Sequence, residues 1–217
     1  LFSLMGIEIL IGYGLTETFA AVTINTVKHH KSGTVGKPIG DVDIKFDTDG
    51  EILVKTKKAL KEYYKNPKAT KDVFTDDGYF RTGDIGEFTD DGYLKITDRK
   101  KDLIKTSGGK YVAPQKIENM LKQNTNISQV LVIGDNQKYI SAIINLESLT
   151  PDTNMLDQIK KFIQQVNSSL PSYETIKKFE IITEPWTTEN GFLTPSLKVK
   201  RKLLEKKYSE LIGKLYQ

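Results

Sequence analysis

The charged stretch Asp98-Arg99-Lys100-Lys101-Asp102 divides this sequence of 217 residues into two parts with different patterns. It lies between a β-prone segment and a pair of glycines at 108–109, a composition typical of a linker between domains. The chain is long enough to form two small domains, each with its own core. We therefore predict one domain over residues 1–97, a hinge over 98–103 and a second domain over 104–217.

On the N-terminal side, short β-prone segments alternate with turn signals. Residues 42–46, 52–55 and 93–97 are separated by Asp-Gly pairs at 49–50, 77–78 and 91–92, each a strong hairpin signal. Residues 7–11 form an apolar run that we predict to be a buried strand, and the glycine-rich turn 12–14 follows it. This side is predicted to contain α/β structure that ends in a small β-rich subdomain.

The C-terminal side has helical and strand periodicities in alternation, which predicts an α+β domain. Pro114 opens a predicted helix, and residues 130–133 and 140–146 form a predicted strand pair around the turn 135–136. A helix over 156–170 and a strand over 177–182 follow. The apolar residues between Leu203 and Leu215 keep helical spacing and predict a terminal amphipathic helix.

Composition excludes several functions. The sequence has no cysteine, so disulfides, zinc–cysteine sites and thiol nucleophiles are ruled out for these residues. It contains no apolar run of 18 residues. Together with the lack of cysteine, this leads us to expect a cytoplasmic protein. The apolar start without Met or a basic leader is expected to be a cut through a larger domain, although trimming or a short disordered leader would also explain it.

The net charge of +4 is unevenly distributed, because residues 198–207 contain six basic residues and a single acidic one. Nucleic acid, an anionic membrane surface or a phosphorylated small molecule would each complement such a run. An ordinary solvated helix face would explain it equally well.

Two segments of the N-terminal part carry residues suited to a nucleotide. The loop Tyr13-Gly14-Leu-Thr16-Glu17-Thr18 could stack a base, donate to phosphate oxygens and hold a hard cation, although a capping turn with Thr16 or Thr18 as N-cap is the structural alternative. The turn Arg81-Thr-Gly-Asp84 could place a carboxylate on the hydroxyls of a ribose, although Asp after Gly is common in ordinary turns.

Two further segments present cations. Residues 98–110 hold five basic residues interrupted by Gly108 and Gly109, which would let the backbone approach a phosphorylated ligand; a charged linker is the alternative. The segment lacks the Gly-x4-Gly-Lys-Ser/Thr spacing of a Walker phosphate-binding loop, so it is not such a loop. Residues 190–198 end on Lys198, a compact cation suited to a carboxylate or phosphate oxygen, or else a solvated lysine ahead of a helix.

In this order, the four segments resemble the signature series of the adenylate-forming superfamily, which includes acyl-CoA synthetases, luciferases and peptide-synthetase adenylation domains. The resemblance covers residues 12–204 and implies the end of a large N-terminal domain with a distorted-barrel subdomain, followed by a mobile C-terminal domain. It implies ATP, AMP, CoA and Mg²⁺ as ligands. By resemblance, Tyr13 and Gly14 lie at the adenine, Thr16 contacts the α-phosphate, and Glu17 ligates Mg²⁺.

The resemblance also assigns roles to the later segments. Asp84 and Arg99 would hold the ribose, and Lys198 would approach the reacting carboxylate and the α-phosphate. The pivot would lie within residues 98–101, where Lys101 aligns best with it. The loop from Lys105 to Lys110 would line the CoA channel. Leu197 departs from the family pattern, which has glycine before the lysine.

Residues 106–114 and 193–201 resemble long-chain fatty acid CoA ligases, and medium-chain or aryl acid ligases remain alternatives. A phosphate loop upstream of Tyr13 is expected in the family but is absent from this sequence, so we expect a fragment that is inactive alone. A non-catalytic AMP-binding module and a basic nucleic-acid or membrane module are the competing hypotheses. We expect small-molecule partners, no nucleic acid, and leave open a peripheral membrane contact of the intact enzyme.

Overall fold

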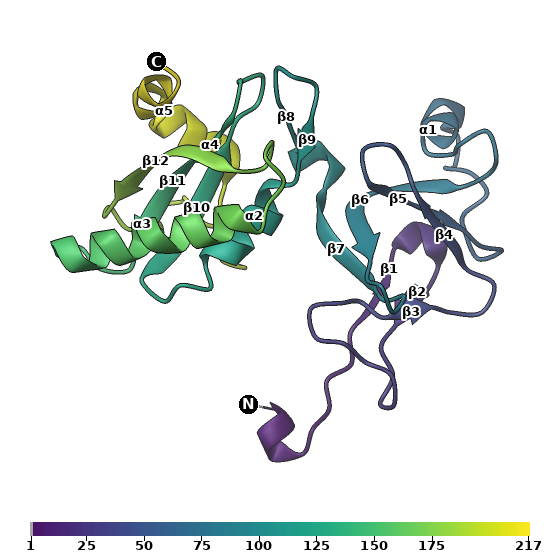
Figure 1. Cartoon of the computed structure of the whole chain (residues 1–217). Coiled ribbons are helices and arrows are strands. Elements are labelled where there is room, and N and C mark those ends of the chain that lie inside the picture. Colours follow the sequence, from purple (N-terminus) through teal and green to yellow (C-terminus); the bar gives the residue numbers. More distant parts are fainter. Residues whose placement is uncertain (1) are drawn as a thin grey trace. The chain divides into compact units, whose positions relative to one another are not determined.

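The computed structural model describes residues 2–217, which divide into two compact units, one ending at Lys101 and the other spanning Asp102–Gln217. The first unit contains two antiparallel sheets (Figure 1). One sheet has the order β1-β2-β3, from Gly12–Gly14, Ala21–Ile24 and Lys37–Pro38. The other has the order β4-β5-β6-β7, from Asp43–Phe46, Glu51–Lys55, Phe80–Phe88 and Leu94–Arg99.

The hairpins of the first unit follow the predicted turns. Gly50 and Gly92 both have positive φ, at 83° and 80°, and each lies in a turn that joins antiparallel neighbours. The β-rich subdomain is therefore confirmed, and its sheets are open, because no described strand closes a barrel. The core of the unit consists of Tyr13, Val22, Ile52, Val54 and Leu94. Three short helices complete it: η1 (Phe2–Met5), η2 (Thr16–Thr18) and α1 (Pro67–Asp72).

The predicted buried strand at residues 7–11 is wrong. These residues have no regular secondary structure, and Ile7, Ile9 and Ile11 are exposed by 48%, 60% and 51%. A strand becomes stable only when a neighbour completes its backbone hydrogen bonds. Among residues 7–11 the Ile7 N–H donates to the nearby Phe2 carbonyl oxygen at 3.0 Å and the Ile11 carbonyl oxygen accepts from the Asn25 N–H at 2.9 Å, which is too little to form a strand.

The second unit is a three-stranded sheet covered by helices on both faces. Its order is β10-β11-β12, from Ile127–Ile133, Ile140–Leu146 and Ile176–Ile182; β10 runs antiparallel and β12 parallel to β11. Helix α3 (Thr153–Ser168) makes the crossover between the parallel strands and begins where Asp152 accepts a bond from the Met155 N–H at 2.7 Å. The hairpin β8 (Ile104–Lys105) and β9 (Tyr111–Val112) precedes α2 (Pro114–Leu121).

The central strand β11 is buried along its whole length. Ala142 and Ile144 face the cluster that contains α2 and α3, whereas Ile143 faces a second cluster with Trp186 and Leu204. Successive side chains of a strand point to opposite faces of the sheet, and here apolar side chains are buried on both faces. The predicted α+β fold is thus confirmed, with one difference: the terminal helix is two helices, α4 (Arg201–Lys207) and α5 (Ser209–Leu215).

Candidate functional site

Asp84 is the centre of a buried polar cluster in the first unit. Its side chain is 3% exposed; the Tyr13 hydroxyl donates to Asp84 Oδ2 at 2.6 Å, and Arg99 Nε donates to Oδ1 at 2.8 Å. Strands β6 and β7 pair Asp84 directly with Arg99, and β1 supplies Tyr13. The structure thus brings together three residues that the sequence predicted for one ligand, from positions up to 86 apart.

Tyr13 acts as a fixed donor in this cluster. Its ring belongs to the core of the unit and is 9% exposed. Burial, followed by the hydrogen bond with Asp84, raises the pKa of the Tyr13 phenol above its usual range, so the hydroxyl keeps its proton. Arg99 differs, since 53% of its side chain is exposed. The carboxylate is therefore held by a buried donor and an exposed cation.

Gly14 is required by the close approach of two chain segments. A Cβ atom at this position would lie 2.5 Å from the Ala20 carbonyl oxygen and 2.7 Å from Ala21 Cα. Next to it, Thr16–Thr18 form a single turn of 3₁₀ helix with Leu15 as N-cap, so neither threonine has the predicted capping position. Thr18 is buried and its hydroxyl accepts from the Leu15 N–H at 3.0 Å, while Thr16 is exposed.

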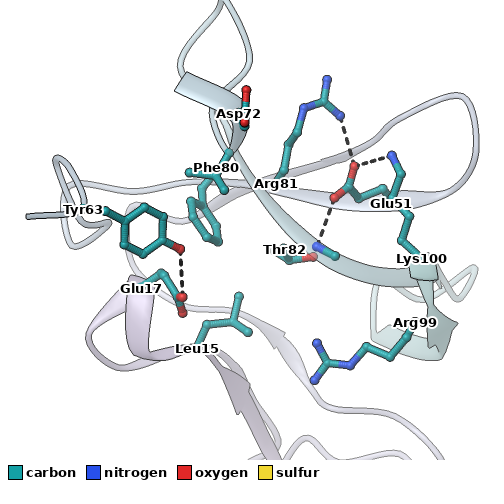
Figure 2. A pocket seen from close by; sticks show the side chains of 12 residues that line it. Leu15, Glu17, Glu51, Tyr63, Asp72, Phe80, Arg81, Thr82, Arg99 and Lys100 are labelled. Carbon is teal, nitrogen blue, oxygen red and sulfur yellow. Dashed lines mark hydrogen bonds and ion pairs between the residues drawn. The ribbon is translucent and has the colours of Figure 1, made fainter. Parts of the chain in front are cut away.

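Glu17 lies on the wall of an open cavity of about 710 Å³ (Figure 2). The Tyr63 hydroxyl donates to Glu17 Oε1 at 3.0 Å; burial first, and then this bond, raise the pKa of Tyr63. The other oxygen of Glu17 has no bond among the described residues, so the carboxylate can accept a further ligand. Arg99 and Thr82 line the same cavity, which places the Asp84 cluster at its edge.

Glu51 is a buried carboxylate that the sequence analysis missed. Arg81 Nη1 and Lys100 Nζ approach its Oε2 at 3.0 and 2.8 Å, and the Gly83 N–H donates to Oε1 at 3.0 Å (Figure 2). Gly83 precedes Asp84, so Glu51 fixes the backbone from which Asp84 projects. Its partners lie 30 to 49 residues away in the chain, and no local pattern links them.

Asp47 and Asp49 surround Glu51, and the three carboxylates lie within 4.8 Å of one another, a spacing that could hold a metal ion. Arg81 also contacts Asp47 at 2.7 Å and Lys100 also contacts Asp49 at 2.7 Å. Two cations thus offset two of the three negative charges and contact all three carboxylates, which we interpret as a structural ion-pair network.

Lys198 lies in the second unit on a tight loop. Its N–H donates to Thr194 Oγ1 at 3.0 Å and its carbonyl oxygen accepts from the Thr194 N–H at 2.8 Å. Leu197 has the left-handed φ of 58° and is 61% exposed. Lys198 is exposed and has no side-chain ion pair within the described part of the chain, so it can approach a ligand.

The Lys105 to Lys110 turn joins β8 and β9 in the second unit. Gly109 has φ of 75°, and its N–H donates to the Thr106 carbonyl oxygen at 2.8 Å. Lys105, Gly108 and Lys110 are exposed. The turn therefore presents two cations and two small residues to solvent.

The predicted pivot coincides with the end of the first unit. Asp98 is buried in β7 and accepts a bond from the Arg99 N–H at 2.7 Å, while Lys101 is exposed within the 3₁₀ turn η3 (Lys100–Asp102). The units separate after Lys101. A role for these residues in motion stays a prediction.

The fold and the order of these segments define the class of adenylate-forming enzymes. Residues 101–217 match the model of the AMP-binding enzyme C-terminal domain, and the chain belongs to that family. It is 37% identical to the long-chain-fatty-acid–CoA ligase FadD15 of Mycobacterium bovis over 231 residues, a match that covers 97% of this chain and 38% of that protein.

Solved structures agree with this assignment. The adenylation domain of the carboxylic acid reductase from Segniliparus rugosus, solved with AMP and a carboxylic acid, superposes with a TM-score of 0.69 at 28% identity, over 99% of this chain and 36% of that one. The O-succinylbenzoate coenzyme A synthetase from Bacillus subtilis, solved with ATP and a magnesium ion, gives 0.67 at 25% identity, over 94% and 42%.

Proposed function

We propose that this chain is part of a long-chain fatty acid–CoA ligase that forms AMP. The proposal rests mainly on Asp84, which is held between Tyr13 and Arg99 at the edge of an open cavity. A buried carboxylate with one cationic neighbour can accept both hydroxyls of a ribose without leaving its charge unpaired. The 37% identity to a long-chain ligase supports the substrate class.

The proposed reaction has two steps. A carboxylate oxygen of the fatty acid attacks the α-phosphorus of ATP, and the bond to pyrophosphate breaks. The CoA thiol, which loses its proton, then attacks the acyl carbon, and AMP leaves with the electrons of the acyl–oxygen bond. Negative charge builds on the α-phosphate in the first step, so oriented donors and cations lower its barrier.

The residues of the chain divide these tasks in our proposal. Asp84 and Arg99 bind the ribose, with Tyr13 and Gly14 beside the adenine, and Thr16 donates to the α-phosphate. Glu17, with an oxygen open to the cavity, suits a Mg²⁺ ion shared with phosphate oxygens, since Mg²⁺ is commonly held by one or two carboxylates plus substrate phosphates. When bound, the ion would neutralise phosphate charge.

We assign the remaining tasks to the second unit. Lys198 would approach the carboxylate and α-phosphate during the first step, whereas Lys105, Gly108, Gly109 and Lys110 would contact CoA in the second. Rotation of the second unit at Asp98 and Lys101 would present the Lys198 face to the reacting groups in the first step and the Lys105–Lys110 face in the second. We place the reaction in the cytoplasm, with a peripheral membrane contact of the intact enzyme.

Calorimetric titration with AMP tests the nucleotide assignment on the chain itself. Asp84→Asn keeps the size of the side chain but removes its charge and half of its acceptor capacity, and we expect AMP affinity to fall on the order of tenfold or more. The exposed Asp90 provides the matched control Asp90→Asn, which should bind AMP like the parent. Equal affinity of the Asp84 variant and the parent would contradict the proposal.

A further inference from the structure

Positive charge is concentrated in one segment of the first unit, residues 57–71, which we call the lysine loop. It contains six lysines and only one acidic residue, Glu62, and therefore carries a charge of +5. The whole chain carries +4, so the remaining residues together are slightly negative. The segment follows β5 and includes most of α1; its lysines are Lys57, Lys58, Lys61, Lys65, Lys68 and Lys71.

The charges of the lysine loop face solvent and are uncompensated. All six lysines are exposed, and none forms an ion pair with any of residues 2–217. The basic run at 198–207 differs, because Arg201 binds Glu118 at 2.7 Å and Lys207 binds Glu184. Part of that run therefore stabilises the second unit, whereas the lysine loop has no such structural use.

The loop also presents an aromatic ring. Tyr64 is 84% exposed, and the Lys65 ammonium lies 5.2 Å from the centre of its ring. Tyrosine is enriched where proteins meet the headgroup layer of a bilayer, because the ring is apolar and the hydroxyl polar. Single-stranded nucleic acid would instead favour several stacking rings and arginines, and the loop has no arginine.

The loop is fastened to the body of the unit at defined points. The Leu60 N–H donates to the Glu17 carbonyl oxygen at 2.7 Å, and the Tyr63 hydroxyl donates to Glu17 Oε1 at 3.0 Å. Within the loop, the Tyr63 N–H donates to Thr70 Oγ1 at 2.9 Å. Asn66 caps α1 by accepting from the Ala69 N–H at 3.1 Å. The lysines are therefore displayed on an ordered support that adjoins the candidate nucleotide cavity.

We propose that the lysine loop is a docking surface for an anionic phospholipid bilayer, with its ammonium groups at the headgroup phosphates and the Tyr64 ring in the headgroup layer. Within residues 2–217 no helix has the length and apolar character to cross a bilayer. The inference extends the proposed function, since it names the surface that would bring a ligase to a lipid phase.

Vesicle flotation tests this surface. Vesicles contain phosphatidylcholine alone or equal parts of phosphatidylcholine and phosphatidylglycerol, and no nucleotide is present. The parent chain should bind the anionic vesicles and lose affinity as salt is raised. The triple variant Lys58→Gln, Lys61→Gln, Lys68→Gln should bind them on the order of 100-fold more weakly, from the usual contribution of each lysine near an anionic surface.

Three controls make the result specific. The variant Lys122→Gln, Lys161→Gln, Lys177→Gln removes the same charge from exposed positions of the second unit and should keep the parent affinity. Tyr64→Ser should weaken binding without changing its salt dependence. Circular dichroism of each variant establishes that it is folded.

Two results would overturn the inference: equal binding of both triple variants to anionic vesicles, or a preference of the parent for nucleic acid over vesicles at equal salt. Because AMP is absent from this assay, its failure would leave the calorimetric result on Asp84 untouched. Loss of AMP binding would likewise leave vesicle binding intact.

Discussion

Leu197 has a backbone conformation that residues other than glycine rarely adopt. Its φ is 58°, which lies in the left-handed region, so the backbone of the residue immediately before Lys198 is strained. A left-handed conformation costs a branched residue on the order of 1 kcal/mol. Strain of this kind often accompanies a functional loop, and here it lies where the adenylate-forming family pattern has glycine.

We expect Leu197→Gly to raise the free energy of unfolding by about 0.5 to 1 kcal/mol, because glycine adopts positive φ without penalty. Urea denaturation provides the measurement. Leu149 is exposed to nearly the same extent, 62% against 61%, but does not have positive φ. Leu149→Gly should therefore be neutral or destabilising, and equal effects of both variants would show that strain at Leu197 is unimportant.

In the intact enzyme, we expect Lys198→Ala to slow adenylate formation by 10²-fold or more, on the order of what one charged transition-state contact contributes. Thioester formation from a supplied acyl-adenylate should proceed at the parent rate. Pyrophosphate exchange measures the first step and CoA consumption the second. Lys202→Ala, an exposed lysine of α4, is the matched control. Equal loss in both steps would contradict the role.

At the scale of single residues, sequence reasoning found Tyr13, Asp84 and Arg99 because each lies in a short, recognisable segment. It missed Glu51, although this carboxylate holds the Gly83 backbone and two cations. The ion pairs of Glu51 depend on how β5, β6 and the end of β7 align, and strand register is a property of the folded sheet.

At the scale of helices and strands, local sequence patterns predicted the hairpins and most helices. The strand predicted at residues 7–11 was wrong because it lacks a neighbouring strand. The Asp-Gly turns fold as expected because their requirement for positive φ is local. Residues 7–11 are not a strand because strand formation depends on a neighbour. The break between α4 and α5 at Tyr208 was not predicted either, because apolar spacing continues across it.

Tyr208 makes the break between these helices sensitive to alkaline pH. Burial is the main factor that raises the pKa of Tyr208 to about 12; its hydroxyl accepts from Trp186 Nε1 at 3.1 Å and donates to Glu184 at 2.8 Å. The phenol pKa is about 10 in an unfolded chain. The contribution of protonated Tyr208 to the free energy of unfolding is thus complete below pH 10 and is lost as pH rises from about 10 to 12.

The prediction is that Tyr208→Phe reduces the alkaline loss of stability of the second unit. Trp186 is the only tryptophan, so its fluorescence reports urea unfolding of that unit alone. The parent midpoint should fall more steeply than that of the variant between about pH 10 and 12. Tyr173→Phe, at a tyrosine that is 41% exposed, should retain the parent profile. Identical slopes for all three proteins would refute the assignment.

For the whole molecule, the structure shows two cores that share no residue. Tyr13, Val22, Ile52, Val54 and Leu94 pack in the first unit, and the two clusters around β11 pack in the second. Units with separate cores can unfold separately. This is the physical condition for a chain whose second half rotates at residues 98–103, a role that stays a prediction.

Selective destabilisation of each core tests that independence. Ile52 and Ile163 are buried to 0% and 2% exposure, one in each unit, and either change to Ala should cost about 2 to 5 kcal/mol. Ile52→Ala should increase hydrogen exchange in β5 and β6 but leave the urea midpoint of Trp186 fluorescence unchanged. Ile163→Ala should lower that midpoint and leave exchange in β5 and β6 as in the parent. If either variant shifted both signals equally, the chain would unfold as one cooperative body, and rotation of the second unit would require breaking contacts that stabilise the first.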